Sequence, residues 1–551
     1  MHSQDDLNYL AGQIGEFGKY QLFQHVLHCL VWLLAGVNVF SFVFVFPVIE
    51  HRCYVSEIDD EWSPNSELST YIPTLEEEKL SSCEKYRNPG TNNSTISCGE
   101  HGYMYIYNSS YYGSSRITEL DMVCEREWMR TLLQSIFLFG ALVGAAGGGA
   151  LADKFGRKPV LFYSGVLSFF WGFGSTFLDN FYLCTFCMMM YGVFGAGAGS
   201  VPAVTLSMEL VGPSIRSYCG AAITFAFACG GVIVVGLAYF ISWNASLLQL
   251  IYVTLSLSLF GNWWLVDESI CWLWEQRRYE EAIQLLEKAA KINGIKLSFP
   301  EGFDQHSTVK STQTEVQPQS QAKQQPANKA SILDVFRTPE IRKRTLVMMC
   351  SWFAAAVLFF GLSFNSVNMF GNPYVVFLIV CVAEFPAHPI SIFLMPKFGY
   401  KLMLVGNLLF SGTACVILAF LPSDIVSTTL AMVAKLSATM IYNIVNAYTS
   451  ELFPTVIRNT TLGLCIMGAR FGGCVIPLIN MLTVFSGKLP EFIFGGTAII
   501  TSVAVLFFLP ETMNKPIPQT IEDVENQRKQ ARKNDEVENG GISNVGYVHE
   551  G

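Results

Sequence analysis

The sequence predicts an all-α polytopic membrane protein in which twelve transmembrane helices are arranged as two six-helix repeats. The first observation is composition: 51% of the 551 residues are hydrophobic and only 14% are charged, whereas soluble domains are about a quarter charged. The second is a series of twelve apolar stretches, each close to the roughly 20 residues that span a bilayer. The third is a set of short motifs that recurs about 243 residues later in the chain.

The repeated motifs occur in the same order in both halves. The segment containing Asp153, Gly156 and Arg157 has a degenerate copy at 395–401. A single match of this kind is plausible by chance, but three in one order at one spacing indicate two copies of one hydrophobic unit. Parallel repeats about an axis along the membrane normal are the architecture of one large class of secondary transporters. The other two matches are Glu209 and Arg216 with Glu451 and Arg458, and 267–269 with 510–512.

The predicted spans divide the chain into an N-terminal half, 1–266, and a C-terminal half, 345–510. Several of the apolar stretches are rich in Gly and Ser, which allow helices to pack closely in lipid. In the first half the spans are 23–46, 131–151, 160–178, 183–204, 219–241 and 247–266. In the second half they are 345–364, 374–395, 402–421, 427–449, 461–483 and 490–509.

One long polar loop, 48–130, separates the first two spans and has the features of an extracellular segment. Four cysteines in an acidic loop with glycosylation sequons are typical of an oxidising compartment, where they form two disulfides. Four cysteines allow three pairings, and the sequence does not choose among them. The cysteines are Cys53, Cys83, Cys98 and Cys124, and the acceptor asparagines are Asn92, Asn93 and Asn108.

A second polar segment, 267–344, links the halves, and residues 511–551 form a polar tail. The linker contains an amphipathic stretch at 279–291 and a Gln-rich run at 312–329 that is too polar to bury a core. Basic residues 342–344 abut the seventh span, and basic residues beside spans favour the cytoplasm. We therefore expect the linker and both termini on the cytoplasmic side of the plasma membrane, with the cysteine-bearing loop outside.

No motif for covalent or nucleotide chemistry is present. The sequence contains no Walker loop, no zinc-ligand spacing and no nucleophile elbow. We therefore expect neither an enzyme nor an ATP-driven pump, and no cofactor or metal. The expected partners are the lipid bilayer and a small organic ion rather than nucleic acid, and the coupling ion or counter-substrate is left open.

The candidate binding residues are charged side chains inside apolar spans, where charges are costly and usually face a pathway or cavity. Glu384 and His388 are four residues apart and share a helix face, while Lys435 and Arg470 lie in later spans. A purely structural buried ion pair is the alternative for these residues. Aromatic side chains that could wall the cavity and hold a cation, or simply pack, are Trp352, Phe359, Phe360, Tyr442 and Tyr448.

Several motifs together resemble the organic cation, anion and carnitine transporter family of the major facilitator superfamily, over nearly the whole chain. Two departures stand out. The segment 267–273 lacks the two prolines and the arginine usual after the sixth span, and Pro396 and Tyr400 replace the Asp and Arg of the second loop motif. The second departure puts a symmetric cytoplasmic charge lock in doubt. The motifs are 153–158, Val123 and Cys124 with Trp128, 336–339 with 342–345, 451–459 and 509–512.

The resemblance implies a major facilitator fold, transport by alternating access and a set of site residues. Glu384 falls where cation carriers keep an acid, and Arg470 where anion and carnitine carriers keep an arginine. A substrate with both an amine and a carboxylate would satisfy both, so we favour organic cations or zwitterions of the carnitine type. An organic anion exchanger, or a receptor or sensor on the same fold, is the alternative. The remaining implied binding positions are Trp352, Phe359, His388, Lys435 and Tyr442; the expected gating residues are Asp153, Gly156, Arg157, Glu209, Arg216, Glu451 and Arg458.

Overall fold

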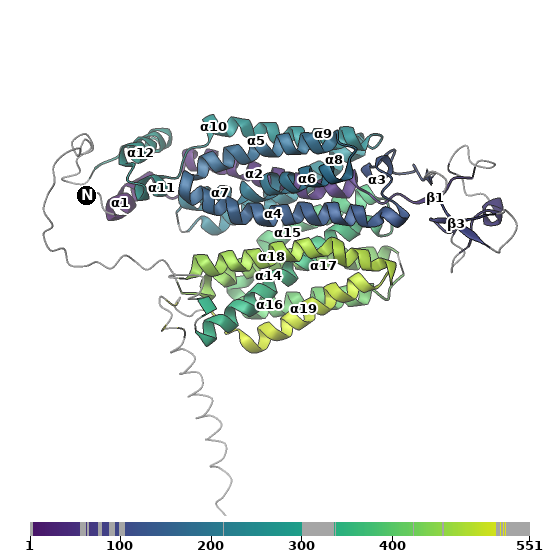
Figure 1. The fold of residues 1–551 in the computed structure, drawn as a ribbon. Coiled ribbons are helices and arrows are strands. Elements are labelled where there is room, and N and C mark those ends of the chain that lie inside the picture. The colour runs from purple at the N-terminus through teal and green to yellow at the C-terminus, as the bar shows by residue number, and fades with distance from the viewer. Residues whose placement is uncertain are drawn as a thin grey trace, which may run out of the picture.

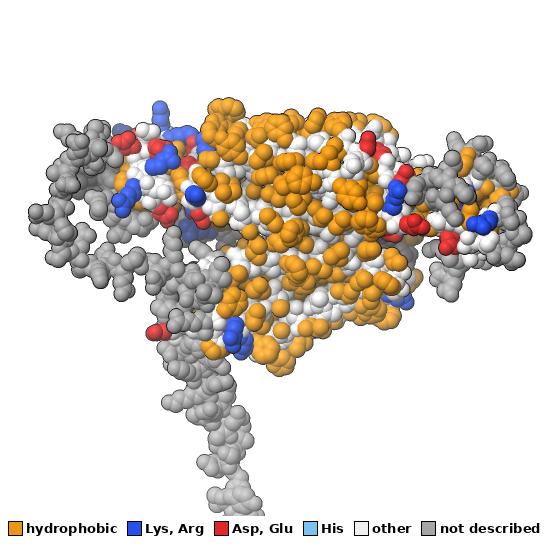
Figure 2. Space-filling view, viewed as in Figure 1, with side chains coloured by type: hydrophobic (Ala, Val, Ile, Leu, Met, Phe, Trp, Pro, Cys, Tyr) orange, Lys and Arg blue, Asp and Glu red, His pale blue; other side chains and the backbone are white. Residues whose placement is uncertain are grey.

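The computed structural model in Figure 1 consists of two helical halves, connected by a linker. It describes residues 4–299 and 335–513 and positions 518, 522 and 524, except 56–61, 63–65, 75–79, 88–93, 99–104, 213, 337, 423 and 455–456. Hydrophobic side chains cover the middle of both halves in Figure 2, and charged side chains gather at the two ends. This distribution is that of a protein whose long helices cross a bilayer.

The helices of the two halves follow the predicted order. The first half contains α2 (Lys19–Val45), α4 (Glu127–Phe155), α5 (Arg157–Thr176), α6 (Phe181–Gly192) with α7 (Ser200–Leu210), α8 (Arg216–Phe240), and α9 (Ala245–Leu255) with α10 (Asn262–Leu265). The second contains α14 (Pro339–Asn365), α15 (Pro373–Phe398), α16 (Tyr400–Leu418), α17 (Ile425–Leu452), α18 (Arg458–Met481) and α19 (Leu489–Phe508).

Eleven helical segments of the described chain are long and apolar enough to cross a membrane. The twelfth predicted span, 160–178, corresponds to α5, which has 20 residues, the same length as α19. Ser, Gly, Tyr and Trp residues lower the mean hydropathy of α5, which is why it is not among the eleven candidate spans. The structure is therefore consistent with twelve spans.

The helices of the first half pack closely at a break between α6 and α7. Residues Val193–Ala198 form a π-helical turn, η4, and the glycines of α4 lie directly against it. A Cβ placed on Gly144 would lie 2.0 Å from the carbonyl oxygen of Val193, and one on Gly148 would lie 2.5 Å from that of Ala198. Only glycine permits this approach, so small residues bring these two spans together, as expected in lipid.

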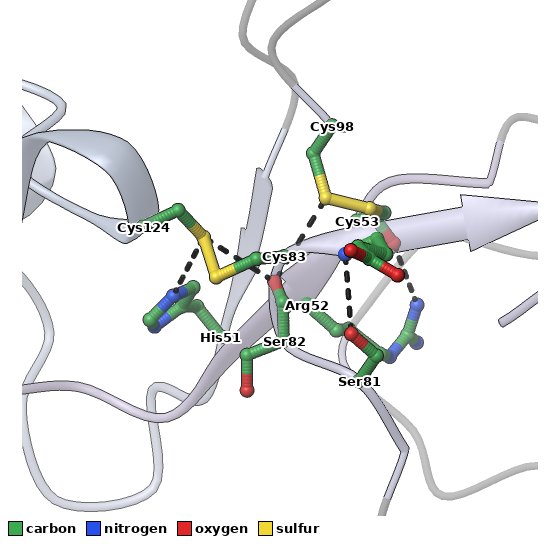
Figure 3. Close-up of a disulfide and its surroundings, with 9 residues drawn as sticks. His51, Arg52, Cys53, Ser81, Ser82, Cys83, Cys98 and Cys124 are labelled. Carbon is green, nitrogen blue, oxygen red and sulfur yellow. Dashed lines mark hydrogen bonds between the residues drawn. A yellow bond between two sulfur atoms is a disulfide. The ribbon is translucent and has the colours of Figure 1, made fainter. Parts of the chain in front are cut away.

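The cysteine-bearing loop forms its own small structure beyond one end of the bundle. Strand β1 (His51–Cys53) pairs antiparallel with β4 (Tyr105–Tyr107), and β2 (Glu84–Tyr86) pairs antiparallel with β3 (Thr95–Ser97). Disulfides Cys53–Cys98 and Cys83–Cys124 cross-link the loop (Figure 3). The expectation of two disulfides is confirmed, and the structure selects one of the three possible pairings. The expected glycosylation sites Asn92 and Asn93 lie outside the described residues.

The opposite end of the bundle carries a small helical cluster from the N-terminus and the linker. It comprises α1 (Gln4–Ile14), α11 (Ile270–Glu275) and α12 (Tyr279–Asn293), packed around buried Leu10, Trp272 and Leu286. Helix α12 confirms the amphipathic stretch predicted at 279–291. We call this end of the bundle the linker end, and the end that carries the disulfide-bonded loop the loop end.

The two halves meet along two pairs of helices, α4 with α18 and α8 with α15. One hydrophobic cluster of buried residues runs through both halves and includes Phe40 and Phe137 of the first and Phe377 and Ile441 of the second. The candidate binding residues lie on α14, α15, α17 and α18, near this boundary.

Candidate functional site

The centre of the candidate site is a buried ion pair between Glu384 of α15 and Lys435 of α17. The Lys435 Nζ lies 2.9 Å from Glu384 Oε1, and the two side chains are 0% and 2% exposed. A charge buried without a partner would be very costly, so the two residues neutralise each other. The sequence left open a structural ion pair between Glu384 and Arg470. In the structure Glu384 pairs with Lys435 instead.

Phe359 of α14 completes the environment of the Lys435 ammonium group. Lys435 Nζ donates a hydrogen bond of 3.1 Å to the Phe359 carbonyl oxygen and lies 3.0 Å from the centroid of its ring. The aromatic face stabilises the cation through its quadrupole. In this structure the cation against the Phe359 ring is Lys435, and the substrate-holding role expected of Phe359 stays a prediction.

An aromatic wall extends from Phe359 toward the linker end. The Tyr442 ring packs edge-on to Phe359, with centroids 5.2 Å apart, and to Trp352 at 6.0 Å. Trp352 is fixed by a 3.0 Å hydrogen bond from its Nε1 to Thr449 Oγ1. Tyr442 retains partly exposed surface, whereas Trp352 and Phe359 are buried. Among these three rings, Tyr442 is the one that keeps exposed surface.

Two other aromatic residues singled out from the sequence lie beside this wall or away from it. Tyr448 donates its hydroxyl hydrogen bond to the Pro510 carbonyl, and its ring stacks on Tyr400 near the linker end. Phe360 packs against Phe359 and stacks on Phe364. Both roles are packing roles, which was the simpler interpretation of aromatic residues in membrane helices.

His388 lies one helical turn from Glu384 and joins the two halves. Its Nδ1 is 3.1 Å from Asn443 Nδ2 and 3.4 Å from Thr224 Oγ1, which belongs to α8 of the first half. Asn443 also donates a 2.8 Å hydrogen bond to Ser391 Oγ. Asn443 and Thr224 were not among the candidates predicted from the sequence, because an uncharged polar residue in a span gives no signal comparable to a charge.

Arg470 differs from the other charged residues of the site. It is half-buried and lies near Tyr442 of the neighbouring helix α17. Within the described chain, no carboxylate lies within ion-pair distance of its guanidinium group. Because arginine stays protonated, Arg470 contributes an uncompensated positive charge beside the aromatic wall.

The first half contributes aromatic side chains rather than charges to the boundary. Phe227 of α8 lies 6.5 Å from Phe359, measured between ring centroids, and Phe40 of α2 lies 5.7 Å from Phe377 of α15. Neither residue was a sequence candidate, since the chain contains 42 phenylalanines and most of its spans carry at least one. Their contacts show that the site lies between the halves.

The first gating cluster is organised around a glycine at the turn between α4 and α5. Gly156 has a φ of +102°, and a Cβ there would lie 2.4 Å from Glu268 Oε2. Glu268 Oε1 accepts a 2.9 Å hydrogen bond from the Arg157 amide, so it caps the start of α5. The Arg157 side chain pairs with Glu209 at 3.2 Å and with Asp153 at 3.6 Å. We call this contact of a glutamate with a positive-φ glycine turn the clasp.

The second half contains the same clasp at the equivalent positions. Gly399 has a φ of +81°, with Glu511 Oε2 2.7 Å from where its Cβ would be, and Glu511 accepts a 3.2 Å hydrogen bond from the Lys401 amide. Both the glycines and the glutamates of the two clasps are 243 residues apart. Thr512 hydrogen-bonds Glu451, as Ser269 does Glu209. The internal repeat is therefore seen in the structure as well as in the sequence, since both halves form the same contact between a glutamate and a glycine turn.

The remaining residues of the predicted gating set differ between the two halves. Tyr400 occupies the position of Arg157, so the second half lacks the Arg157 charge network, as its departure from the loop motif suggested. Arg216 is exposed and Arg458 is half-buried. Across the described positions, neither forms an ion pair with the glutamate seven residues before it. Their place in the gating set stays a prediction.

The loop end is closed by aromatic contacts around Tyr374 at the start of α15. Its ring stacks on Phe44 of α2 at 5.2 Å and contacts Tyr112 and Tyr239. Its hydroxyl donates a 2.9 Å hydrogen bond to the Tyr111 carbonyl oxygen. At the linker end, by contrast, the Asp153 side chain is 79% exposed. These contacts hold the two halves together at the loop end.

Comparison with known proteins agrees with this architecture. The model of the sugar (and other) transporter family matches residues 85–523. The chain is 32% identical to an organic cation transporter protein of Drosophila melanogaster over 97% of each chain. It is 33% identical to human solute carrier family 22 member 13, covering 94% of this chain and 92% of the relative. It is 30% identical to rat organic cation/carnitine transporter 2 over 94% of each chain.

Solved structures provide a comparison of the fold. A partially occluded inward-open conformation of the xylose transporter XylE from E. coli superimposes with a TM-score of 0.59 at 17% identity. The match covers 90% of this chain and 99% of that one. A second XylE structure, in an inward-open conformation, gives 0.56 at 17% identity, covering 91% and 98%. The shared feature is the fold.

Proposed function

The chain belongs to the organic cation, anion and carnitine transporter family of the major facilitator superfamily, and we propose that it carries small organic ions bearing a carboxylate, zwitterions foremost. This narrows the expectation from sequence, which placed organic cations and zwitterions together. The single observation that carries the proposal is the unpaired positive charge of Arg470 beside the aromatic wall.

Charge balance at the site argues against a purely cationic substrate. Glu384 and Lys435 neutralise each other at 2.9 Å, so neither offers a free charge. Arg470 remains, and a cation brought next to it in a low-dielectric interior would be repelled. A substrate carboxylate would instead supply the partner that Arg470 lacks, with a bidentate geometry that guanidinium groups favour.

The amine of a zwitterion would lie against the aromatic wall. Tyr442 is partly exposed and contacts both Trp352 and Phe359. Aromatic faces attract ammonium groups, most strongly when both are desolvated. One face of Phe359 is already occupied by Lys435, so Tyr442 and Trp352 are the rings left to a substrate. The geometry that supports the proposal is thus the Arg470 guanidinium group on α18 and the aromatic wall on the neighbouring helices α14 and α17.

Transport would proceed by alternating access of the site from the two ends. Tyr374 and its neighbours close the loop end, while at the linker end the Asp153 carboxylate is exposed and its ion pair is with Arg157 of the same half. We assign this structure to a state closed at the loop end. In our proposal the linker end and both termini face the cytoplasm, the loop end faces outward, and the membrane is the plasma membrane.

Uptake of matched substrates by cells expressing this chain tests the proposal. The panel contains a betaine-type zwitterion, its methyl ester, which keeps the cation and lacks the carboxylate, and an isosteric carboxylate without the cation. We expect the zwitterion to be carried best and the ester least. Preferential uptake of the ester would overturn the proposal.

The two alternatives give distinct outcomes in the same assay. An organic anion exchanger, which the Arg470 charge also favours, would carry the isosteric carboxylate best and be accelerated by preloading the cells with a second anion. A receptor or sensor on this fold would reach the surface and carry none of the three compounds.

A further inference from the structure

A cavity of about 410 Å³ at the linker end lies outside the transport site and has no assigned occupant. It opens where the membrane helices of the first half meet the linker helices α11 and α12. Its apolar lining comes from the ends of the spans and includes Phe155, Pro159 and Trp263; its polar lining comes mostly from residues 267–288. It therefore combines an apolar wall at the membrane boundary with a charged rim.

The acids that line this cavity are ion-paired or hydrogen-bonded, and the basic residues that line it are ion-paired with one exception. Lys288 Nζ lies 2.6 Å from Asp267, and Arg278 lies 2.6 Å from Glu281. Glu268 is engaged as the clasp and accepts hydrogen bonds from the first amides of α5. All three acids that line the cavity are thus neutralised or hydrogen-bonded.

Lys158 is the exception. It lines the cavity and is half-buried, and in the part of the chain that the structure describes no carboxylate lies within ion-pair distance of its Nζ. Its closest aromatic contact is the Trp263 ring, 5.7 Å from Nζ to centroid. The cavity therefore presents one uncompensated ammonium group, above an apolar wall, at the depth where the helices leave the membrane.

Exposed aromatic side chains next to the cavity indicate that lipid reaches it. Phe155 is 56% exposed and Trp264 is 75% exposed, on the outer surface of the first half. Tryptophan in particular is enriched at the headgroup level of bilayers. A ligand that enters from this side would have acyl chains along these rings and a polar group toward Lys158.

We propose that this cavity binds the phosphodiester of an anionic membrane phospholipid, with Lys158 as its cationic contact. A phosphodiester supplies the one negative charge that Lys158 lacks. A headgroup that also carried an ammonium group would find no free carboxylate here, because the three acids are engaged. The cavity thus favours headgroups whose remaining part is uncharged, such as phosphatidylglycerol.

A bound lipid would act next to the gate of the first half. The amide of Lys158 is part of the clasp, since it donates to Glu268 at 3.2 Å. Helix α12 supplies Gln284, Leu285 and Lys288 to the same cavity. The headgroup would therefore bridge the turn between α4 and α5 to the linker helix, independently of which substrate the transporter carries.

Lipid retention by the purified full-length protein tests the proposal without measuring transport. The protein in detergent is supplied with phosphatidylglycerol or phosphatidylcholine, and bound lipid is counted by native mass spectrometry. Lys158→Gln should lower phosphatidylglycerol retention about fivefold, the effect of one basic residue at an anionic lipid surface. Lys154→Gln is the matched control, because Lys154 is a neighbouring cation that does not line the cavity.

A gain-of-binding variant keeps the test decisive if Lys158→Gln is poorly folded. Gln284 lines the cavity on the exposed face of α12, so Gln284→Lys should raise phosphatidylglycerol retention without disturbing the fold. Unchanged retention in both variants would overturn the proposal. So would displacement of the lipid by millimolar inorganic phosphate, which would make the site one for free anions, or equal retention of phosphatidylcholine.

Discussion

At the scale of single residues, the charged side chains of the site divide into a structural pair and a free cation. Glu384 and Lys435 neutralise each other, whereas Arg470 has no acidic partner within the described residues. The sequence identified all three, because a charge in an apolar span is conspicuous. It did not identify the pairing, because which charges meet depends on helix rotation and register between α15, α17 and α18.

The unpaired state of Arg470 leads to a selectivity prediction. Arg470→Ala should reduce uptake of a carboxylated substrate about 100-fold, since a buried carboxylate left without its partner costs ~3 kcal/mol or more. Arg470→Lys should retain part of the activity, because it keeps the charge but loses the planar fork. Initial uptake rates, normalised to surface protein, measure both. Equal loss of every compound of the panel would instead make Arg470 part of the transport machinery common to all.

The Glu384–Lys435 pair leads to a stability prediction. Lys435→Met leaves the Glu384 carboxylate buried without a partner and should destabilise the fold by ~3–5 kcal/mol. The double variant Lys435→Met with Glu384→Gln removes both charges and should recover most of the loss. Thermal unfolding of the purified variants, monitored by size-exclusion chromatography, gives the comparison. If the double variant is no more stable than the single one, the pair is not the source of the effect.

At the scale of elements, the sequence predicted the helices well and their irregularities poorly. The predicted spans correspond to the helices of the two halves, α2, α4 to α10 and α14 to α19, because apolar length is set by bilayer thickness. The π-helical turn η4 within the fourth span was not foreseen, although its Gly and Ala residues and the facing glycines of α4 carry the signal. These glycines and alanines could not be interpreted from the sequence alone, because the sequence does not say that α4 packs against η4.

The two clasps lead to a prediction about turn glycines. Gly156→Ala and Gly399→Ala should each lower the yield of folded protein, because the backbone is left-handed there and the new Cβ would meet Glu268 or Glu511. Gly147→Ala is the control, since nothing lies within 4 Å of a Cβ at this helical position. The measured quantity is the fraction of monodisperse protein after purification. A normal yield for both clasp variants would show that these turns accept a side chain, and that the glycines are not required.

At the scale of the whole molecule, the orientation of the loop is the first testable property. The disulfides Cys53–Cys98 and Cys83–Cys124 require an oxidising environment, which the cell exterior provides. Asn108 lies in this loop within a glycosylation sequon, so an outside loop should carry a glycan there. Glycosidase treatment should then increase the gel mobility of protein from cells. Asn108→Gln should reduce the shift. Absence of any shift, together with labelling of Cys53 by an impermeant thiol reagent only after the cells are permeabilised, would place the loop inside.

The second property of the whole molecule is the closure of the loop end, which depends on Tyr374. This residue of the second half donates its hydrogen bond to Tyr111, which lies in a loop segment anchored to the first half, where Gly113 bonds Ser242. Opening the loop end must break this bond and separate the Tyr374 ring from Phe44. Tyr374→Phe removes the bond and keeps the stacking, so it should open the loop end modestly. Tyr374→Ala removes both and should open it further.

Cys381 provides a native reporter of that opening. It lies two helical turns from Tyr374 on α15, is 1% exposed, and its sulfur lies 2.6 Å from where a Cβ on Gly231 of α8 would be. The contact between the halves thus shields the thiol from the loop end. An impermeant thiol reagent added to intact cells should label Cys381 slowly in the wild type, faster in Tyr374→Phe and fastest in Tyr374→Ala, with Cys381→Ser as the background. Equal labelling rates in all three would mean that closure rests on contacts other than those of Tyr374. A graded increase would show that one tyrosine couples the disulfide-bonded loop to the movement of the second half.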